Sequence, residues 1–247
     1  MINLDLLVVA PEQLIAPGRA SHVFDTPYGA VRAAVDQFGA QPGAWVAATV
    51  SPFAAIYAAR AAGATRVVEL VPVRALNRLL LPGDLLLPDD LVDLTQQQRY
   101  TFFAGKGYGF LAQREPFCPV LRGALFAALR ERTPRSFARA TYLAIEEQPY
   151  TAPDASWDTD IVGAGVVPAS FLARELELCY APVCVVGGQG SRAADEPSMA
   201  HTGDLLASAI VDALARLPTE RACGCATAMQ QYRDRGDIGP DWRTWLG

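Results

Sequence analysis

The chain has 247 residues, of which 51% are hydrophobic, and its formal net charge is −5. The apolar share is enough to bury both faces of a sheet, and the acidic balance without a basic patch argues against a nucleic-acid partner. The longest apolar runs, such as Leu4–Ala10, are too short to span a bilayer, and no charged segment introduces a signal peptide. We therefore expect a cytoplasmic protein without a membrane partner. No linker divides the chain, so residues 1–247 are predicted to form one domain.

The first half of the chain alternates buried strands with helical stretches. Strands are predicted at Leu4–Ala10, Trp45–Val50 and Arg66–Val71. Between the last two, a helix is predicted over Phe53–Ala62, ending at Gly63. A Pro-Gly turn then precedes a short strand.

The second half continues the same alternation. The segment 118–132 has helical spacing, with Leu121, Leu125 and Leu129 on one face. Further strands are predicted at Thr141–Glu146 and Ala181–Val186, and further helices at 168–178 and from 202 onward, with Thr202 as the N-cap. This order predicts an α/β fold with a mixed, mostly parallel central sheet that is flanked by helices on both faces.

The five cysteines include no C-x-x-C pair, which is typical of a reduced intracellular protein. Cys118 and Cys179 are expected to be buried rather than functional. Cys223 and Cys225 are too close in sequence for an ordinary zinc knuckle and have no evident partners. We interpret them as a surface thiol pair.

The two histidines, His22 and His201, have unrelated spacing and cannot assemble a metal site. His201 is expected just before a helix begins, as a residue near its cap. We therefore predict neither a metal ion nor a cofactor.

Seven segments in collinear order resemble the methylthioadenosine phosphorylase branch of the nucleoside phosphorylase family. They are DTPYG (25–29), AIYAARAAGATRV (55–67), PGDLLLPDDLVDLT (82–95), TFF (101–103), EPFCP (115–119), YLAIE (142–146) and VPASFLARELELCYA (167–181). The resemblance covers residues 4 to about 215. It implies a helix-flanked mixed sheet, a homotrimer with sites near the subunit interfaces, and cleavage of a purine N-glycosidic bond by phosphate.

Three segments to which the resemblance assigns phosphate binding are altered here. The glycine-rich loop after the first strand is replaced by APEQL (10–14), in which Pro11 lacks an N–H. The Arg-His-Gly loop before the first helix is replaced by ATVSPFA (48–54). A phosphate-contacting threonine and its neighbour are replaced by Ala164 and Gly165. Loss of several such hydrogen bonds predicts very weak phosphate binding.

The segments that face the base and its leaving nitrogen differ as well. The sequence Ala-Cys-Gly-Ser before the Pro-Gly turn is replaced by Pro72–Ala75, which places Arg74 in the pocket. An aromatic residue that stacks on the base falls at Tyr150, a retained feature. The acids that contact purine N7 are replaced by glycine in GGQG (187–190). This stretch matches neither the GxGxxG nor the Walker A pattern, so we interpret it as a lost acid site rather than a phosphate loop.

The predicted cleft lies at the strand ends near 71–74, 147–150, 163–165 and 187–190. Glu147 replaces a family glycine there and could form a rearranged polar pocket with Arg74 and Gln189. His22 precedes a segment that lies close to the cleft in the family. The candidate ligand-binding residues are His22, Val71, Pro72, Arg74, Glu147, Tyr150, Gly163, Ala164, Gly165, Gly188, Gln189 and Gly190.

Three hypotheses for the function remain open. The first is a re-purposed enzyme with lost or altered phosphorolysis, acting on a nucleoside-derived or other small biosynthetic intermediate. The second is a non-catalytic binding or scaffold homologue that partners an active paralogue. The third, which the altered motifs disfavour most, is a true purine nucleoside or methylthioadenosine phosphorylase. Each implies a small-molecule, nucleoside-like partner.

Overall fold

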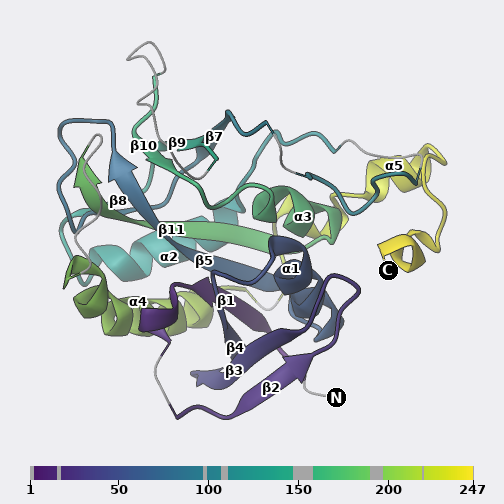
Figure 1. Ribbon diagram of the computed structural model, residues 1–247, viewed down its shortest axis with the longest axis horizontal. Coiled ribbons are helices and arrows are strands. Elements are labelled where there is room, and N and C mark those ends of the chain that lie inside the picture. Colours follow the sequence, from purple (N-terminus) through teal and green to yellow (C-terminus); the bar gives the residue numbers. More distant parts are fainter. Residues whose placement is uncertain are drawn as a thin grey trace.

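The computed structural model describes residues 3–15, 18–96, 99–106, 111–146, 158–189, 197–218 and 220–246, and side chains at 189 and 197–202 are not described. Its main feature is a mixed sheet of eleven strands (Figure 1). The strands are β1 (Leu6–Ala10), β2 (Ser21–Phe24), β3 (Val31–Phe38), β4 (Gln41–Ala47), β5 (Arg66–Ala75), β6 (Leu85–Leu86), β7 (Asp90–Asp93), β8 (Ser136–Phe137), β9 (Thr141–Ala144), β10 (Ile161–Gly163) and β11 (Cys179–Gln189).

The sheet is built around β5 and β11, which run parallel along their whole lengths through the centre of the molecule (Figure 1). On the other side, β5 pairs first with β1 and then with β10, and the full order on that path is β2-β3-β4-β1-β5-β10-β9-β7. β1, β4, β5 and β11 are parallel to one another, whereas β10 is antiparallel to β5. The predicted mixed, mostly parallel sheet is confirmed.

The partner strand of β5 changes halfway along it, and this change creates an opening in the sheet. Pairing with β1 extends to Val9 opposite Glu69, and pairing with β10 involves Val162 opposite Arg74. Between these two pairs, β1 has left β5 and β10 has not yet joined it. Such a switch between neighbouring strands is where α/β sheets bind ligands.

Helices cover both faces of the sheet, as predicted. The α-helices are α1 (Pro52–Ala61), α2 (Pro119–Arg130), α3 (Ala169–Glu175), α4 (Pro197–Arg216) and α5 (Gln230–Asp234), and 3₁₀ turns lie at η1 (Glu12–Leu14), η2 (Gly224–Thr227) and η3 (Trp242–Leu246). One hydrophobic core contains residues of α1 and α3 together with Trp242, and the other contains residues of α2 and α4. The predicted apolar face of α2, Leu121, Leu125 and Leu129, is buried in the second core.

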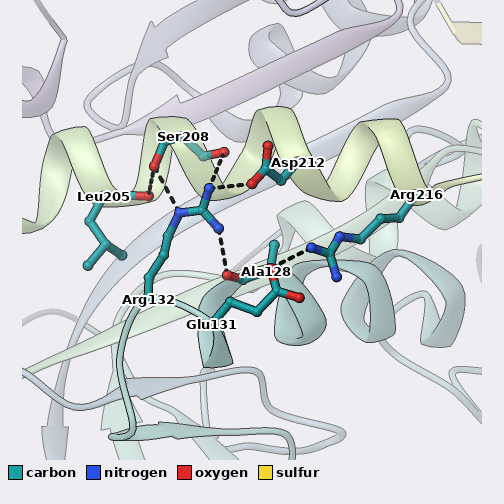
Figure 2. A network of polar contacts seen from close by, with 7 residues as sticks. All are labelled: Ala128, Glu131, Arg132, Leu205, Ser208, Asp212 and Arg216. Carbon is teal, nitrogen blue, oxygen red and sulfur yellow. Dashed lines mark hydrogen bonds and ion pairs between the residues drawn. The ribbon is translucent and has the colours of Figure 1, made fainter.

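Arg132, just beyond α2, joins that helix to α4 (Figure 2). Its guanidinium donates to the carbonyl of Ala128 at 2.8 Å and to the hydroxyl of Ser208 at 3.0 Å, and it also pairs with Asp212. A second ion pair links Arg216 to Glu131 at 2.6 Å. These contacts fix how the two helices of this layer lie against each other.

The C-terminal segment, 220–246, packs against the first core rather than extending the sheet. Trp242 and Trp245 lie against the ring of Phe103, and the hydroxyl of Tyr28 donates to the carbonyl of Leu246. Glu177 accepts from the side chains of both Arg233 and Arg243. The segment is therefore attached to the core at several separated points.

Several predicted boundaries are wrong. The second strand, β4, ends at Ala47, because residues 48–50 form a turn. α4 begins at Pro197, so Thr202 is not its N-cap and His201 lies within the helix. Strands β2, β3 and β10 were not predicted. Within the described part of the chain, no helix has the length and apolar character needed to cross a membrane.

Candidate active site

A pocket of about 120 Å³ lies beside β5, where β1 and β10 separate. Its walls come from the end of β1, the turn after β4, the first turns of α1 and residues 164–169 between β10 and α3. Apart from Glu69 on β5, every lining residue is glycine, alanine, valine, isoleucine or proline. Glu69 is therefore the one titratable side chain among the described residues that line the pocket.

Two of the three segments to which the resemblance assigns phosphate line this pocket, and the first of the three begins directly after a lining residue, Val9. Val9 comes from the end of the first strand, Ala48 and Pro52 from the loop before α1, and Ala164 and Gly165 from the third segment. The fold thus brings two of the segments marked by the resemblance, and the end of the first strand, to one pocket. The side chains that these segments place there are small and apolar.

Two backbone amides of the loop before α1 are already hydrogen-bonded within the protein. The N–H of Ala48 donates to the carbonyl of Ala10 at 2.8 Å, and the N–H of Val50 donates to the carbonyl of Ala47 at 3.0 Å. Pro52, the first residue of α1, has no N–H. These three positions therefore offer no free backbone donor of the kind that phosphate sites use.

Glu69 is fully buried, and its carboxylate has two donors. The hydroxyl of Tyr180 donates to Oε2, and the backbone N–H of Val166 donates a second hydrogen bond. Burial raises the pKa of Glu69 because it disfavours the charged carboxylate, and the two hydrogen bonds oppose that rise. Burial also raises the pKa values of the neighbouring Tyr142 and Tyr180, so both phenols are held protonated.

Two of the predicted glycines are needed for close packing around Glu69. A Cβ added at Gly163 would lie 2.4 Å from the hydroxyl oxygen of Tyr142. A Cβ added at Gly165 would lie 3.0 Å from Val71 Cγ1 and 3.3 Å from Glu69 Oε1. The absence of side chains at both positions lets the segment after β10 approach β5.

The predicted strand ends of β5 and β11 are brought side by side. Arg74 lies opposite Val162 on one side and Gly188 on the other. Val71 is buried, whereas Pro72 is exposed. This part of the predicted cleft lies beside Gly165, a lining residue, at Val71 and continues along β5 to Arg74.

The glycines after Val186 do not form a phosphate loop or a turn. β11 continues through Gly187 and Gly188 to Gln189, with a register shift between Val186 and Gly188. The prediction that the strand ends at Val186 is therefore wrong, because Gly188 and Gln189 remain paired with β5. Glu147, Tyr150 and Gly190 lie outside the described residues, so their place in the cleft remains a prediction.

His22 lies on β2, the strand at one edge of the sheet, and its ring packs edge-on against Phe24 at 4.5 Å. β3, β4 and β1 separate β2 from β5. Within one chain, the fold does not bring His22 together with the strand-end residues.

The interpretation of Cys223 and Cys225 as a surface pair without partners is wrong. Their Sγ atoms and those of Cys118 and Cys179 all lie within 4.8 Å of one another. Cys225 is buried and Cys223 is half-buried. Burial of Cys118 and Cys179 is confirmed, each being 3% exposed.

A wider groove of about 770 Å³ lies between residues 112–114 and the C-terminal segment, and is lined by polar side chains such as Arg174, Gln230 and Asp234. One segment marked by the resemblance, 167–181, borders it through Arg174, but among the described residues no strand end and none of the three segments assigned to phosphate does. We therefore place the candidate active site in the smaller pocket beside Glu69.

Sequence reasoning missed Glu69, although a signal was present. A single acid interrupts the apolar run of the third predicted strand, and a lone acid in a strand that is buried on both faces needs a partner or a function. The cysteine cluster had no comparable signal, because its members come from three distant segments.

Comparison with known proteins agrees with this architecture. Among solved structures, methylthioadenosine phosphorylase from an antarctic soil metagenomic library matches with a TM-score of 0.81 and 23% identity, covering 94% of this chain and 92% of its own. Methylthioadenosine phosphorylase from Schistosoma mansoni in complex with tubercidin matches with a TM-score of 0.77 and 20% identity, covering 87% and 93%. These likenesses show the nucleoside phosphorylase fold.

Sequence relatives support the family. The probable 6-oxopurine nucleoside phosphorylase of Dictyoglomus turgidum is 28% identical over 195 residues, covering 73% of this chain and 74% of its own. The 6-oxopurine nucleoside phosphorylase of Pyrococcus furiosus is 29% identical over 245 residues, covering 87% and 92%. The family model for the phosphorylase superfamily matches residues 48–217, which include β5, β10, β11 and most of the lining of the Glu69 pocket. The chain therefore belongs to the phosphorylase superfamily.

Proposed function

We propose that this chain binds a nucleoside-like ligand along β5, β10 and β11 but has lost or altered ordinary phosphate-dependent cleavage. The S. mansoni relative has been solved with tubercidin and with adenine, which supports a nucleoside-like ligand for this fold. The chain keeps the strand arrangement that surrounds the pocket. The side chains that line it, Glu69 apart, are small and apolar, which supports altered chemistry.

The observation that carries the proposal is the buried carboxyl of Glu69 in an otherwise apolar pocket. Phosphate sites rely on cations, free backbone N–H groups and helix N-termini. Here the first turn of α1 borders the pocket, but the nearby amides of Ala48 and Val50 are engaged and no cationic side chain is among the described lining residues. An ionised Glu69 would repel a phosphate dianion at such short range.

A buried carboxyl can instead exchange a proton with water or with the ligand. Glu69 is held at Oε2 by Tyr180 and also by the N–H of Val166, and its Oε1 lies beside Gly165, which lines the pocket. Its raised pKa brings it closer to neutral pH, where general acid–base catalysis is most effective. The reaction that this chemistry supports is cleavage with water as the nucleophile and Glu69 as the base.

Ordinary phosphorolysis is the second candidate. It is favoured by relatives named as phosphorylases that are 28–29% identical over more than 70% of this chain. It would require residues other than those predicted to bind phosphate. A non-catalytic binding role is the third candidate, and the small side chains at Ala164 and Gly165 are consistent with it.

The test is release of base from methylthioadenosine, adenosine and inosine, with and without phosphate, at high protein concentration. Release that is independent of phosphate and falls by about 10²-fold or more in Glu69→Gln would support the proposal. Release that requires phosphate would contradict it and favour the second candidate. If calorimetry shows that a nucleoside binds but no base is released, the result would favour the third candidate, a non-catalytic binding role.

The matched control is Glu131→Gln, which makes the same carboxyl-to-amide change at an exposed ion pair. It should leave base release unchanged.

The resemblance also supports a homotrimer with sites near the subunit interfaces, for which light scattering of the purified protein is the measurement. Co-purification with a paralogue would favour the scaffold role.

A further inference from the structure

The four clustered cysteines lie away from the Glu69 pocket, on the opposite face of the sheet. Cys118, Cys179 and Cys225 belong to the core that contains α2 and α4, whereas the pocket is lined by residues of the other core. We propose that Cys118, Cys179, Cys223 and Cys225 form a structural tetrathiolate site for one zinc ion. The inference is independent of the proposed function, because the two sites share no residue.

The spacing of the sulfur atoms fits a tetrahedral metal. With zinc–sulfur bonds of about 2.3 Å, the sulfurs of a tetrahedral site lie about 3.8 Å apart. All four Sγ atoms here lie within 4.8 Å of one another, and those of Cys179 and Cys223 are 3.3 Å apart. Four soft ligands with no oxygen or nitrogen donor among them favour zinc over magnesium or calcium.

The backbone holds the cysteines in place from three separate segments. Cys118 is the N-cap of α2, and its N–H donates to the carbonyl of Tyr180 at 2.8 Å. Cys179 opens β11, and its N–H donates to the carbonyl of Thr65 at 3.0 Å. Cys223 precedes η2 and Cys225 lies within it, so the C-terminal segment supplies half of the ligands.

Positive charge close to the cluster suits a tetrathiolate site. Zinc with four thiolates carries a net charge of −2, and on binding the thiol protons are released to solvent. A small pocket beside Cys118, Cys179 and Cys223 is also lined by the side chains of Arg66 and Arg221. Two positively charged residues next to the cluster would stabilise that negative charge.

The structural role of the site is to attach the C-terminal segment to the sheet. Cys223 and Cys225 join residues that follow α4 to the beginning of β11 and of α2. A structural zinc site contributes its binding free energy to folding. Loss of the ion should therefore loosen residues 220–246 before it unfolds the rest of the protein.

The experiment is to purify the protein under reducing conditions, remove metal with a chelator, and add back zinc or cobalt(II). We expect about one zinc ion per chain by mass spectrometry of the native protein, and with cobalt the visible absorption of a tetrahedral tetrathiolate complex. Zinc should raise the thermal midpoint and slow proteolysis within residues 220–246. Failure of the reduced, folded protein to take up either metal would overturn the proposal.

Variants separate the site from adventitious binding. Cys223→Ser, at the half-buried position, should remain folded by circular dichroism and lose zinc, and Cys225→Ser should do the same. Cys184→Ala removes the fifth cysteine, which lies on β11 opposite Val71 and outside the cluster, and should keep one zinc ion. If Cys223→Ser does not fold, Cys223→Ala serves in its place. Full zinc occupancy in either folded variant would overturn the proposal. So would a native protein whose four cysteines form two disulfides and which binds no zinc once those disulfides have been reduced.

Discussion

The carboxylate of Glu177 lies 2.8 Å from the guanidinium of Arg243, although the two residues are far apart in sequence. Glu177 also pairs with Arg233 at 3.0 Å, and its backbone carbonyl accepts from Arg221 at 2.6 Å. The side chain of Glu177 is only 7% exposed. Glu177 thus contacts three arginines of the C-terminal segment, two through its carboxylate and one through its backbone carbonyl.

Replacement of Glu177 by glutamine should destabilise the protein. Glutamine has about the same size as glutamate, and both residues carry the same strain at this position, where φ is +59° in the left-handed region. The substitution therefore removes only the charge. Because the arginine side chains are partly exposed, we expect a loss of about 2 kcal/mol in the free energy of unfolding. Urea denaturation measures this loss, with Glu131→Gln, which breaks an exposed ion pair, as the control that should shift the midpoint much less. An equal shift in both variants would contradict the assigned role.

Glu175 should make stability depend on pH near neutrality. Burial raises its pKa from 4.5 to about 7, and hydrogen bonds from Thr101 and from the N–H of Phe102 oppose the rise. The folded protein therefore binds a proton more tightly than the unfolded chain does. The stabilisation, on the order of 3 kcal/mol, is fully present below pH ~4.5 and is lost as the pH rises through about 7.

The variant Glu175→Gln tests this dependence. Glutamine cannot ionise but still accepts from the N–H of Phe102, which lies 2.8 Å from Oε2 in the parent. Thermal midpoints measured between pH 5 and pH 8 should fall with pH in the parent more steeply than in the variant. Parallel curves for the two proteins would show that Glu175 does not titrate in this range.

Gly163→Ala should be destabilising, whereas Gly123→Ala should be stabilising. A Cβ at Gly163 meets the Tyr142 hydroxyl at 2.4 Å, a contact that forces movement in a buried region and costs about 1–3 kcal/mol. Gly123 is exposed in the middle of α2 and has nothing within 4 Å of an added Cβ. Alanine there should add about 0.5–1 kcal/mol. Chemical denaturation of both variants measures the change in the free energy of unfolding. A change of the same sign in both variants would contradict the prediction.

The clash at residue 163 can be isolated in a double-mutant cycle with Tyr142→Phe. Removing the hydroxyl costs its hydrogen bond to the carbonyl of Gly165, which is 3.1 Å long, or about 1 kcal/mol. In that background, Gly163→Ala should cost less than it does in the parent. Strict additivity of the two changes would show that the hydroxyl is not the obstacle.

The fold could be predicted from the sequence where apolar periodicity is strong. The run Arg66–Val71 and the helical spacing of Leu121, Leu125 and Leu129 gave β5 and α2. Strands β2 and β3 could not be found in this way, because Ser21–Phe24 is mostly exposed and Val31–Phe38 mixes charged residues with alanine. β2 forms one edge of the sheet and β3 lies beside it, and partly exposed strands do not need the continuous apolar pattern of a strand buried on both faces.

The candidate site was only partly predictable for a similar reason. The resemblance located the segments around Ala48 and Ala164, and the fold brings them to one pocket. Glu69 and the cysteine cluster depend on contacts between strands or segments that are distant in sequence. Spacing along the chain carries no information about those contacts.

The long parallel pairing between β5 and β11 has a consequence for how the protein forms in the cell. Arg66 lies opposite Cys179, so the centre of the sheet joins two strands with a large part of the chain between them. Such non-local pairing is slow, and an unpaired β5 edge is open to other chains in the meantime. During synthesis, that edge stays uncovered until β11 has left the ribosome. We expect assistance by chaperones to matter most in this interval, and truncations that end before Cys179 to aggregate.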